Sequence, residues 1–384
     1  MHVIIVNYAY AADLTGPDEL IERYFSLVTW ADGLALAGAQ VTVLQAFAAD
    51  AQRQRGSVSY RFINDGLGPH PRAWQIPRRL HQAAAQAQPA AAHVNGLLFP
   101  AQTWALRRRL PPACALLAQH HAERPWPGVR GMAQRWGLAA ADGFMFAART
   151  LAQPWLAQGV ITARQPLFEI MEGAPTFCVG ARAEARALTG LTGDPIFLWA
   201  GNLDANKDPL TVLAGFEMAL PAMPDARLYM AYRFADLLPQ VQNRIAQSAA
   251  LTRAVTLLGQ FSHAEMERYF NSADYFVQGS HHESSGFALL DALACGVAPI
   301  VTDIPTFRIM TDQGKIGVLW PAGDAAALAD ALRAAVARPW AEQAQAARQF
   351  FDARLSVAAI GRQALGIYQS VQRRRSGVRP DARA

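Results

Sequence analysis

The stretch Gly279–Asp303, GSHHESSGFALLDALACGVAPIVTD, limits most strongly what this chain can fold into. An apolar run precedes this stretch. The stretch itself begins with a polar loop that contains glycines, continues as a short amphipathic helix, and ends in another apolar run. This order of strand, loop, helix and strand is the unit of a parallel α/β sheet. Ligands of such sheets bind at the carboxyl ends of the strands, where loops enter helices. The stretch therefore predicts a binding loop in an α/β domain.

Two acidic residues mark this loop and its helix. Glu283 lies in the loop, and Asp291 follows eight residues later inside the helix. We expect the backbone amides of Gly286, Phe287 and Ala288 to lie at the helix N-terminus. Amides in the first turn of a helix have no acceptor within the helix, so this position favours the binding of phosphate. A carboxylate beside a helix N-terminus that can bind phosphate predicts a site for a phosphorylated sugar.

The chain has 384 residues, which is too long for one ordinary core, and two α/β domains are the natural expectation. Each half alternates apolar strands with helical patterns; in the first, Pro17 opens a helix expected to run to Gly38. Glycines and prolines break the rhythm near residues 174–194. We predict a first domain over residues 1–177, a second over 178–356, a terminal helix over 357–375 that returns towards the first domain, and a disordered tail over 376–384.

Composition excludes several classes of protein. An apolar content of 52% with 17% charged residues indicates a globular chain. No apolar run reaches the roughly 18–20 residues that span a bilayer, and the N-terminal MHVIIVNYAY reads as a strand and not as a signal peptide. The cysteines, Cys114, Cys178 and Cys295, have neither metal-ligand spacing nor a disulfide framework. We therefore expect a cytoplasmic protein.

The net charge of +5 comes with three arginine clusters, Arg78–Arg79, Arg107–Arg109 and Arg373–Arg375. They lack the interleaved aromatics of a nucleic-acid module, so nucleic acid is not an expected partner. A solvated surface is the simplest interpretation. The alternative hypothesis is peripheral contact of the first two clusters with an anionic membrane, at its inner face.

A second loop with a chemical signature lies about 80 residues upstream. Gly201–Asp208 reads GNLDANKD and follows an apolar strand. Gly201 allows the backbone to approach a ligand closely, and Lys207 would offer a point charge to a diphosphate. A loop lysine alone is usually only solvated, but the two loops in one domain strengthen each other.

Together the two loops resemble those of the retaining glycosyltransferases of family four. The family's two acids, separated by seven residues, are similar to E-S-S-G-F-A-L-L-D-A-L-A-C-G-V-A-P from Glu283 to Pro299. Its strand followed by G-R-L and a lysine is similar to G-N-L-D-A-N-K from Gly201 to Lys207. The resemblance covers nearly the whole chain and is most specific in the second half. It implies the GT-B fold, in which two Rossmann-like α/β domains face each other across a cleft.

The resemblance implies that the second domain binds a UDP- or GDP-linked sugar as substrate, with no cofactor and no metal, while the first domain binds the acceptor. Glu283 would act at the donor sugar and the reacting centre, Asp291 would hold the nucleotide ribose, and Lys207 would bind the diphosphate. The other donor-binding positions that it implies are Gly16, Gly201, Asn202, Gln260, Gly286, Phe287 and Ala288.

Three departures from the family pattern concern the donor site. Asp291 stands where the family has the longer glutamate. Asn202 stands where the family has arginine, so one charge at the diphosphate is missing, and leaving-group stabilisation would depend more on Lys207 and helix amides. Gly16 stands alone where the family has a glycine pair. Asn202 can still donate a hydrogen bond.

Histidines of the first half are candidates for the residue that the family places near the acceptor and donor sugar. His121 is the preferred catalytic match, with His120 beside it and His93 as a weaker candidate; a hydrogen-bonded core role stays open for each. His281–His282 adjoins Glu283, but no third ligand or helical spacing supports a metal site.

The predicted reaction moves a hexosyl unit from a nucleotide diphosphate sugar to a hydroxyl of a saccharide or lipid-linked acceptor, with retained anomeric configuration, in bacterial glycan biosynthesis. Two alternatives share the fold. One is a nucleotide-sugar epimerase or sugar-phosphate synthase, and the other is a non-catalytic protein that binds a nucleotide sugar, which the departures at Asn202 and Asp291 motivate.

Overall fold

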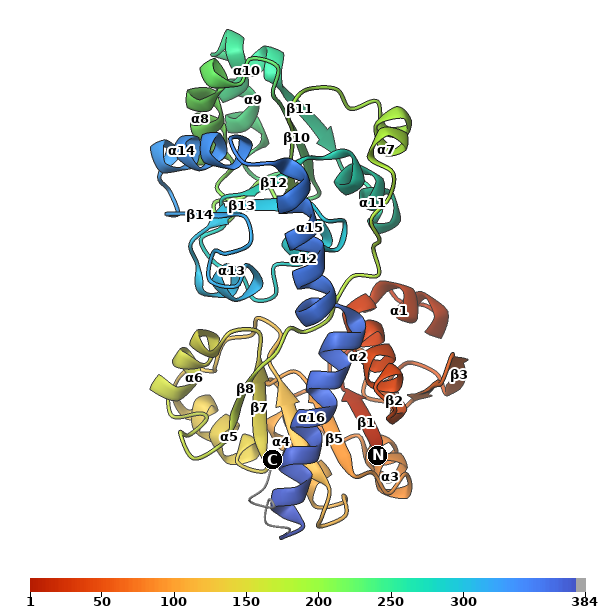
Figure 1. Cartoon of the computed structure of the whole chain (residues 1–384). Coiled ribbons are helices and arrows are strands. Elements are labelled where there is room, and N and C mark those ends of the chain that lie inside the picture. Colours follow the sequence, from red (N-terminus) through yellow and green to blue (C-terminus); the bar gives the residue numbers. More distant parts are fainter. Residues whose placement is uncertain (378–384) are drawn as a thin grey trace. The chain divides into compact units, whose positions relative to one another are not determined.

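The computed structural model describes residues 1–377, which form two compact units (Figure 1). Of the described residues, unit 1 contains Met1–Ala174 and residues 357–377, and unit 2 contains Pro175–Ser356. The sequence places the boundary between residues 177 and 178. Of the predicted tail, residues 378–384 lie outside the described residues.

Unit 1 is built on an eight-stranded sheet in the order β3-β4-β2-β1-β5-β6-β7-β8. All neighbouring strands are parallel except β3 and β4. The strands are β1 (His2–Asn7), β2 (Gln40–Ala46), β3 (Ala51–Arg55), β4 (Val58–Ile63), β5 (Ala91–Asn95), β6 (Ala115–Gln119), β7 (Gly143–Phe146) and β8 (Leu167–Glu169).

Helices cover both faces of this sheet. The helices are α1 (Pro17–Arg23), α2 (Phe25–Leu36), α3 (Arg78–Gln86), α4 (Pro100–Arg107), α5 (Gly128–Leu138), α6 (Gln153–Ala157) and α16 (Val357–Arg375), with a 3₁₀ turn η1 (Arg149–Ala152). α2 and α16 pack together on one face, whereas α3, α4 and α5 bury apolar side chains on the other.

Two details of unit 1 differ from the predictions. The helix expected from Pro17 to Gly38 is broken at Tyr24, whose φ of −95° and ψ of 55° separate α1 from α2. Strand β3 was not predicted because its sequence, AQRQR, is polar and almost wholly exposed at the edge of the sheet. Periodicity cannot detect an edge strand that buries no face.

Unit 2 holds a six-stranded, wholly parallel sheet in the order β11-β10-β9-β12-β13-β14. Its strands are β9 (Ile196–Gly201), β10 (Arg227–Tyr232), β11 (Val255–Gly259), β12 (Tyr275–Gln278), β13 (Ala298–Thr302) and β14 (Val318–Trp320). β9 and β12 are neighbours in the sheet, although the chain visits β10 and β11 between them. The prediction of two parallel α/β sheets is confirmed.

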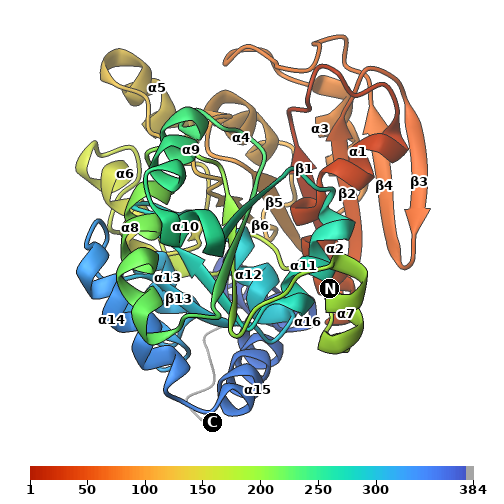
Figure 2. The same cartoon turned by 90° about the horizontal axis from the view of Figure 1, so that it is seen from above.

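The helices of unit 2 also lie on both faces of its sheet, as Figure 2 shows from above. They are α7 (Arg182–Thr189), α8 (Pro209–Ala219), α9 (Leu238–Ala246), α10 (Ala249–Ala254), α11 (His263–Ser272), α12 (Phe287–Ala294), α13 (Pro305–Met310), α14 (Ala325–Val336) and α15 (Trp340–Phe350), with short turns η2 (Leu220–Ala222) and η3 (Phe351–Leu355). α8, α9, α10 and α14 cover one face, and α7, α11, α12 and α15 cover the other (Figures 1 and 2).

Candidate active site

The two predicted loops of unit 2 lie at the point where the order of strands reverses. The chain moves from β9 through β10 to β11 on one side, and then crosses to β12 on the other side of β9. Loops that leave neighbouring strands at such a switch point diverge and leave a crevice for ligands. The lysine loop (Gly201–Asp208) leaves β9, and the acidic loop (Gly279–Gly286) leaves β12.

Asn206 joins these two loops. Its side-chain Nδ2 donates to the backbone carbonyl of His282 at 3.0 Å, and its Oδ1 accepts from the backbone amide of His282 at 3.0 Å. The backbone amide of His281 also donates to the Asn206 carbonyl at 2.8 Å. Gly279 permits this approach, since a Cβ there would lie 3.2 Å from the carbonyl oxygens of Lys207 and Asp208. These hydrogen bonds therefore fix the position of one loop relative to the other.

The contacts between the two loops bring Lys207 and Glu283 together. The Lys207 ammonium forms an ion pair with Oε1 of Glu283, and the two side chains are 17% and 10% exposed. Oε1 of Glu283 also accepts a hydrogen bond of 2.6 Å from the Ser280 hydroxyl, and the Glu283 carbonyl accepts one of 2.7 Å from Thr306. The carboxylate that the sequence predicts to be catalytic is thus held by side chains of the lysine loop and of its own loop, and Thr306 of α13 holds the backbone of Glu283.

A cavity of about 220 Å³ opens beside this pair at the carboxyl ends of β9, β10 and β11. Predicted residues that line it are Gly201, Asn202, Lys207, Gln260, Ala288 and Asp291. Glu283 adjoins the cavity through its ion pair with Lys207. The cavity is mostly polar at the lysine loop, whereas Phe261, Met266 and Phe270 supply an apolar wall. A polar end and an apolar wall suit a ligand with a charged part and a flat ring.

Asp291 is the least satisfied polar group of this cavity. Its side chain is 8% exposed, and its Oδ1 has no hydrogen-bond partner among the described residues. Burial raises the pKa of this carboxyl well above its usual range. A buried acceptor without a partner costs free energy unless a ligand supplies a donor. The position therefore fits a hydroxyl of a bound ligand.

Helix α12 begins at this cavity. Gly286 caps it with φ +56° and ψ 49°, a left-handed conformation that side chains rarely adopt, and a Cβ there would lie 2.9 Å from the Phe307 ring. Gly286 and Phe287 thus determine where α12 starts but are not among the residues that line the cavity. Ala288 is the first residue of α12 that lines it. The N-terminal end of a helix favours negative charge, so this end of the cavity suits phosphate.

Arg233 lines the same cavity and was missed in the sequence reasoning. It follows β10 (Arg227–Tyr232) directly, so the rule that ligands bind beyond the carboxyl ends of strands points to it. Its guanidinium lies 5.1 Å from the Phe234 ring. Arg233 adds a second cation near Lys207, where Asn202 lacks the charge of the family arginine.

The predicted residues of the first half lie in unit 1. His121 follows β6, and its Nδ1 is 3.0 Å from Oε2 of Glu172. Burial lowers the pKa of His121, but the hydrogen bond and charge of Glu172, with the charge of Glu123, outweigh burial and raise the pKa overall. Gly16 precedes α1 in an extended conformation, with open space where a Cβ would lie. Nothing in its surroundings requires glycine.

The other candidate histidines have structural partners. His93 is fully buried on β5, its Nδ1 lies 2.8 Å from the Tyr368 hydroxyl of α16, and burial lowers its pKa to about 3. His120 is buried, and its Nε2 lies 2.9 Å from the Glu123 carbonyl. His281 lies 3.2 Å from Asp208. Among the residues that the structure describes, no three His, Cys, Asp or Glu side chains are grouped to hold a metal ion.

The match to a protein family lies within unit 2. The family described as glycosyl transferases group 1 matches residues 182–350. The chain is 32% identical over 156 residues to the GDP-mannose:cellobiosyl-diphosphopolyprenol alpha-mannosyltransferase of Xanthomonas campestris, covering 40% of this chain and 38% of that protein. It is 39% identical over 88 residues to the phosphatidyl-myo-inositol mannosyltransferase of Mycobacterium leprae, covering 23% of this chain and 24% of that protein. The chain thus spans about a quarter to two fifths of the length of these relatives.

Solved structures resemble the whole chain. The sucrose-phosphate synthase from Thermosynechococcus elongatus has a TM-score of 0.67 at 21% identity and covers 97% of this chain and 99% of its own. The Anabaena protein HepE in complex with UDP has a TM-score of 0.67 at 14% identity and covers 96% of this chain and 100% of its own. At these identities the likeness establishes the fold, which is GT-B with two Rossmann-like sheets.

Proposed function

The chain belongs, through residues 182–350, to the group 1 glycosyl transferases, and from this premise we propose that it is a retaining hexosyltransferase. It would move a hexosyl unit from a UDP- or GDP-linked sugar to an acceptor hydroxyl. The observation that carries this proposal is the combination, at one cavity, of the buried Lys207–Glu283 pair with the buried, unpartnered Oδ1 of Asp291.

The donor would lie across the cavity in one direction. Asp291 would accept from a ribose hydroxyl, and Gln260 with the neighbouring apolar wall would hold the base. Lys207, Arg233 and the first turn of α12 would neutralise the diphosphate, so that protein cations and helix amides serve the leaving group without a metal. Asn202 would add a neutral hydrogen bond.

Glu283 would act at the donor sugar. As the sugar–phosphate bond breaks, positive charge develops on the sugar and negative charge on the diphosphate. Glu283 would stabilise the first and Lys207 the second. The ion pair between them supports this proposal because it keeps the two groups next to each other. The leaving diphosphate would help to deprotonate the acceptor hydroxyl, as the family resemblance implies, and His121 in unit 1 would act at the acceptor side.

The acceptor is proposed from the relatives alone. A saccharide or lipid-linked saccharide would fit the polyprenol- and inositol-linked names of the curated relatives, and GDP-mannose is the first donor to test because one of those names contains it. We place the reaction in the cytoplasm of a bacterium, in glycan biosynthesis. The free state of the described cysteines suits a reducing compartment.

A second candidate function is favoured by Asn202. The missing arginine would weaken leaving-group stabilisation, so a non-catalytic protein that binds a nucleotide sugar is the competing proposal. It predicts donor binding without donor consumption. An assay of sugar release and transfer with candidate acceptors separates the two.

Nucleotide binding is tested first by thermal unfolding with UDP, GDP, ADP and their sugars, because a bound ligand raises the unfolding temperature, and at equal concentration a tighter ligand raises it more. We expect one nucleoside diphosphate to stabilise unit 2. Lys207→Ala should weaken its affinity about tenfold or more, since a charge-assisted contact is lost.

The chain offers a matched control, because its one other lysine, Lys315, forms only an exposed pair with Asp312. Lys315→Ala should leave the affinity unchanged. Equal affinities for wild type and Lys207→Ala would remove the diphosphate role of Lys207.

A further inference from the structure

A basic surface lies at one edge of unit 1, at the amino ends of strands of its sheet. Because β5, β6, β7 and β8 are parallel, the loops that enter them meet at the amino ends of the strands. One acidic residue, Asp142, is found among the described residues of these loops, which are residues 87–90, 108–114, 139–142 and 158–166. The C-terminal end of α16 reaches the same edge, since Arg375 donates to the Pro112 carbonyl at 3.0 Å.

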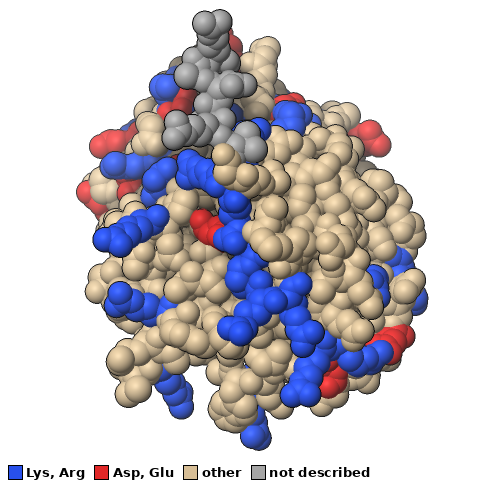
Figure 3. Space-filling view, turned by 90° about the horizontal axis from the view of Figure 1, so that it is seen from below, with Lys and Arg blue, Asp and Glu red and all other residues tan. Residues whose placement is uncertain are grey.

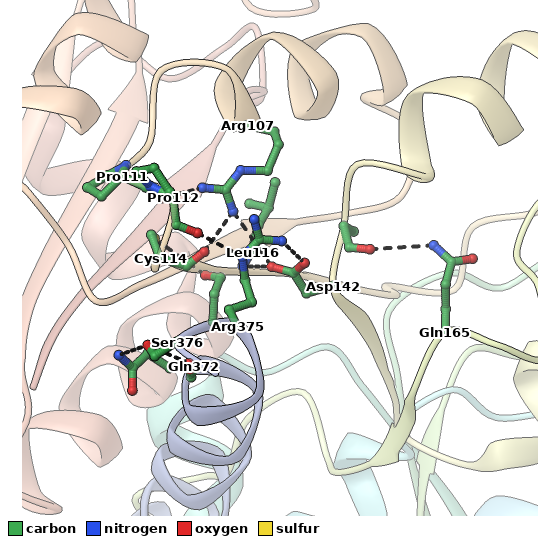
Figure 4. Close-up of polar contacts among 12 residues, drawn as sticks. Arg107, Pro111, Pro112, Cys114, Leu116, Asp142, Gln165, Gln372, Arg375 and Ser376 are labelled. Atoms are coloured by element: carbon green, nitrogen blue, oxygen red, sulfur yellow. Dashed lines mark hydrogen bonds and ion pairs between the residues drawn. The ribbon is translucent and has the colours of Figure 1, made fainter. Parts of the chain in front are cut away.

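Asp142 is already fully engaged (Figure 4). Its carboxylate forms ion pairs with Arg375 and, at 3.6 Å, with Arg107, and it accepts a 2.8 Å hydrogen bond from the Leu116 amide. Arg107 also donates to the carbonyls of Pro111 and Cys114 at 2.6 and 2.7 Å. These two arginines therefore have a structural role in unit 1.

Five further arginines at this edge, called here the arginine face, are exposed and form no ion pair with any described residue: Arg108, Arg109, Arg164, Arg373 and Arg374. Figure 3 shows basic side chains in a band across the face seen from below, with few acidic side chains near them, and unit 1 has no lysine, so its basic side chains are arginines. Uncompensated like charges repel each other, so this face favours an anionic partner.

An apolar stripe adjoins the arginine face. Val129, Met132 and Trp136 of α5 are 81%, 70% and 55% exposed, and their spacing of i, i+3 and i+7 places them on one side of the helix. The Trp136 ring lies 4.7 Å from that of Trp104, and the Arg108 guanidinium lies 4.7 Å from the Trp104 ring. The tryptophan pair thus connects the stripe to the arginines.

We infer that the arginine face and the α5 stripe dock on an anionic phospholipid bilayer. Arginines bind lipid phosphates, while tryptophan, methionine and valine enter the boundary between headgroups and acyl chains. RNA or an acidic protein surface would engage the arginines but leave Val129 and Met132 in water. The contact is peripheral in kind, because no described helix is long and apolar enough to cross a membrane. It does not depend on the proposed transfer activity.

The structure corrects the membrane hypothesis drawn from the sequence, which grouped Arg78–Arg79 with Arg107–Arg109. Arg78 begins α3, at the carboxyl edge of the sheet, whereas Arg107 ends α4 at the amino edge. Arg79 is also paired with Asp50 at 2.7 Å. Arg78–Arg79 is therefore no part of the arginine face.

Flotation of the full chain with vesicles tests the inference. The chain should float with vesicles of phosphatidylglycerol and phosphatidylcholine at low salt, and much less with phosphatidylcholine alone. The arginine variant combines Arg108→Gln, Arg109→Gln, Arg373→Gln and Arg374→Gln. Its partitioning should fall at least about tenfold, because each basic residue near an anionic membrane contributes about fivefold.

The charge-matched control removes four exposed arginines from scattered positions: Arg78→Gln, Arg253→Gln, Arg268→Gln and Arg354→Gln. It should float nearly as wild type does. An apolar variant, Met132→Ser with Trp136→Ser, should lose flotation but retain binding to heparin, a soluble polyanion. Unchanged unfolding temperatures identify variants that are correctly folded.

Three results would overturn the inference. Wild-type chain that stays unbound to anionic vesicles at low salt removes it directly. If the control loses as much flotation as the arginine variant, net charge and not the arginine face is responsible. If the apolar variant floats like wild type, the partner is a soluble polyanion and not a bilayer.

Discussion

At the scale of residues, the lysine and the glutamate of unit 2 depend on each other. Lys207 and Glu283 come from loops that are distant in sequence, and each neutralises the other in a largely buried position. Burial of one charge without its partner is costly, so neither residue can be changed without affecting the other. Their substitutions should therefore be compared with exposed controls of the same chemistry.

We predict that Glu283→Gln lowers turnover at least about 100-fold while nucleotide affinity stays within about threefold, because the lost charge acts on the developing sugar cation and not on the nucleotide. The Ser280 hydroxyl can still donate to the amide oxygen. Glu342→Gln, an exposed change on α15, is the control and should keep full turnover. Activity of Glu283→Gln within a few-fold of wild type would place the reacting centre elsewhere.

Asp291→Asn should have opposite effects on stability and on binding. Because burial holds the pKa of Asp291 above its value in the unfolded chain, its contribution to stability is present below the unfolded pKa and is lost as pH rises through the folded pKa. The variant should therefore gain in unfolding temperature over wild type as pH rises from acid to neutral, and thermal scans across pH measure this.

The same variant should bind nucleoside diphosphate more weakly, since an amide is a weaker acceptor for a ribose hydroxyl than a carboxylate. Asp330→Asn, at an exposed position of α14, is the control. It should change neither the pH dependence of the unfolding temperature nor the affinity for nucleoside diphosphate. Unaltered calorimetric affinity of Asp291→Asn would argue against the ribose role.

At the scale of elements, the start of α12 depends on a single backbone conformation. Gly286 takes a positive φ, and the Phe307 ring occupies the space that a Cβ would need. A different N-cap geometry would shift the whole acidic loop, together with Asp291 one helical turn further on. The start of α12 and the position of Asp291 therefore both depend on the positive φ of Gly286.

Gly286→Ala should lower the free energy of unfolding by about 1–2 kcal/mol, the usual cost of a left-handed non-glycine residue, and should weaken nucleotide binding. Gly16→Ala is the paired test at another of the predicted donor-binding glycines. Its φ of −141° suits any residue, so stability should change by less than about 0.5 kcal/mol. Urea denaturation measures both; equal effects would contradict the conformational argument.

At the scale of the whole molecule, the chain returns to complete unit 1 after building unit 2. Helix α16 lies on α2, where Gly33 and Gly361 let the two backbones meet: a Cβ on Gly361 would lie 1.9 Å from the Gly33 carbonyl oxygen. Trp30 donates to the Tyr368 hydroxyl at 3.0 Å within this contact. Unit 1 therefore contains residues from both ends of the chain.

Two glycines of α16 give a matched pair. Gly361→Ala should destabilise unit 1 by about 2–3 kcal/mol because the helices must separate, whereas Gly366→Ala, with open space around it, should stabilise by about 1 kcal/mol through helix propensity. Urea unfolding that finds the two variants alike would show that α16 does not pack as tightly on α2 as the contact with Gly33 requires.

The sequence by itself determined the class of fold and the two loops. Apolar runs alternating with helical patterns require parallel sheets, and short motifs such as the one from Glu283 to Asp291 are local enough to be read directly. The edge strand β3, the break at Tyr24 and Arg233 were missed, since periodicity cannot detect polar edge strands and no motif surrounds Arg233.

Only the tertiary structure decided which side chains meet. Contacts across the sheet depend on strand order, which local pattern does not specify. That order places Asn206 against His282, joins Lys207 to Glu283, leaves Asp291 buried without a partner, and separates Arg78–Arg79 from the arginine face. The chain specified the groups, and packing of distant segments decided which of them lie close enough to act together.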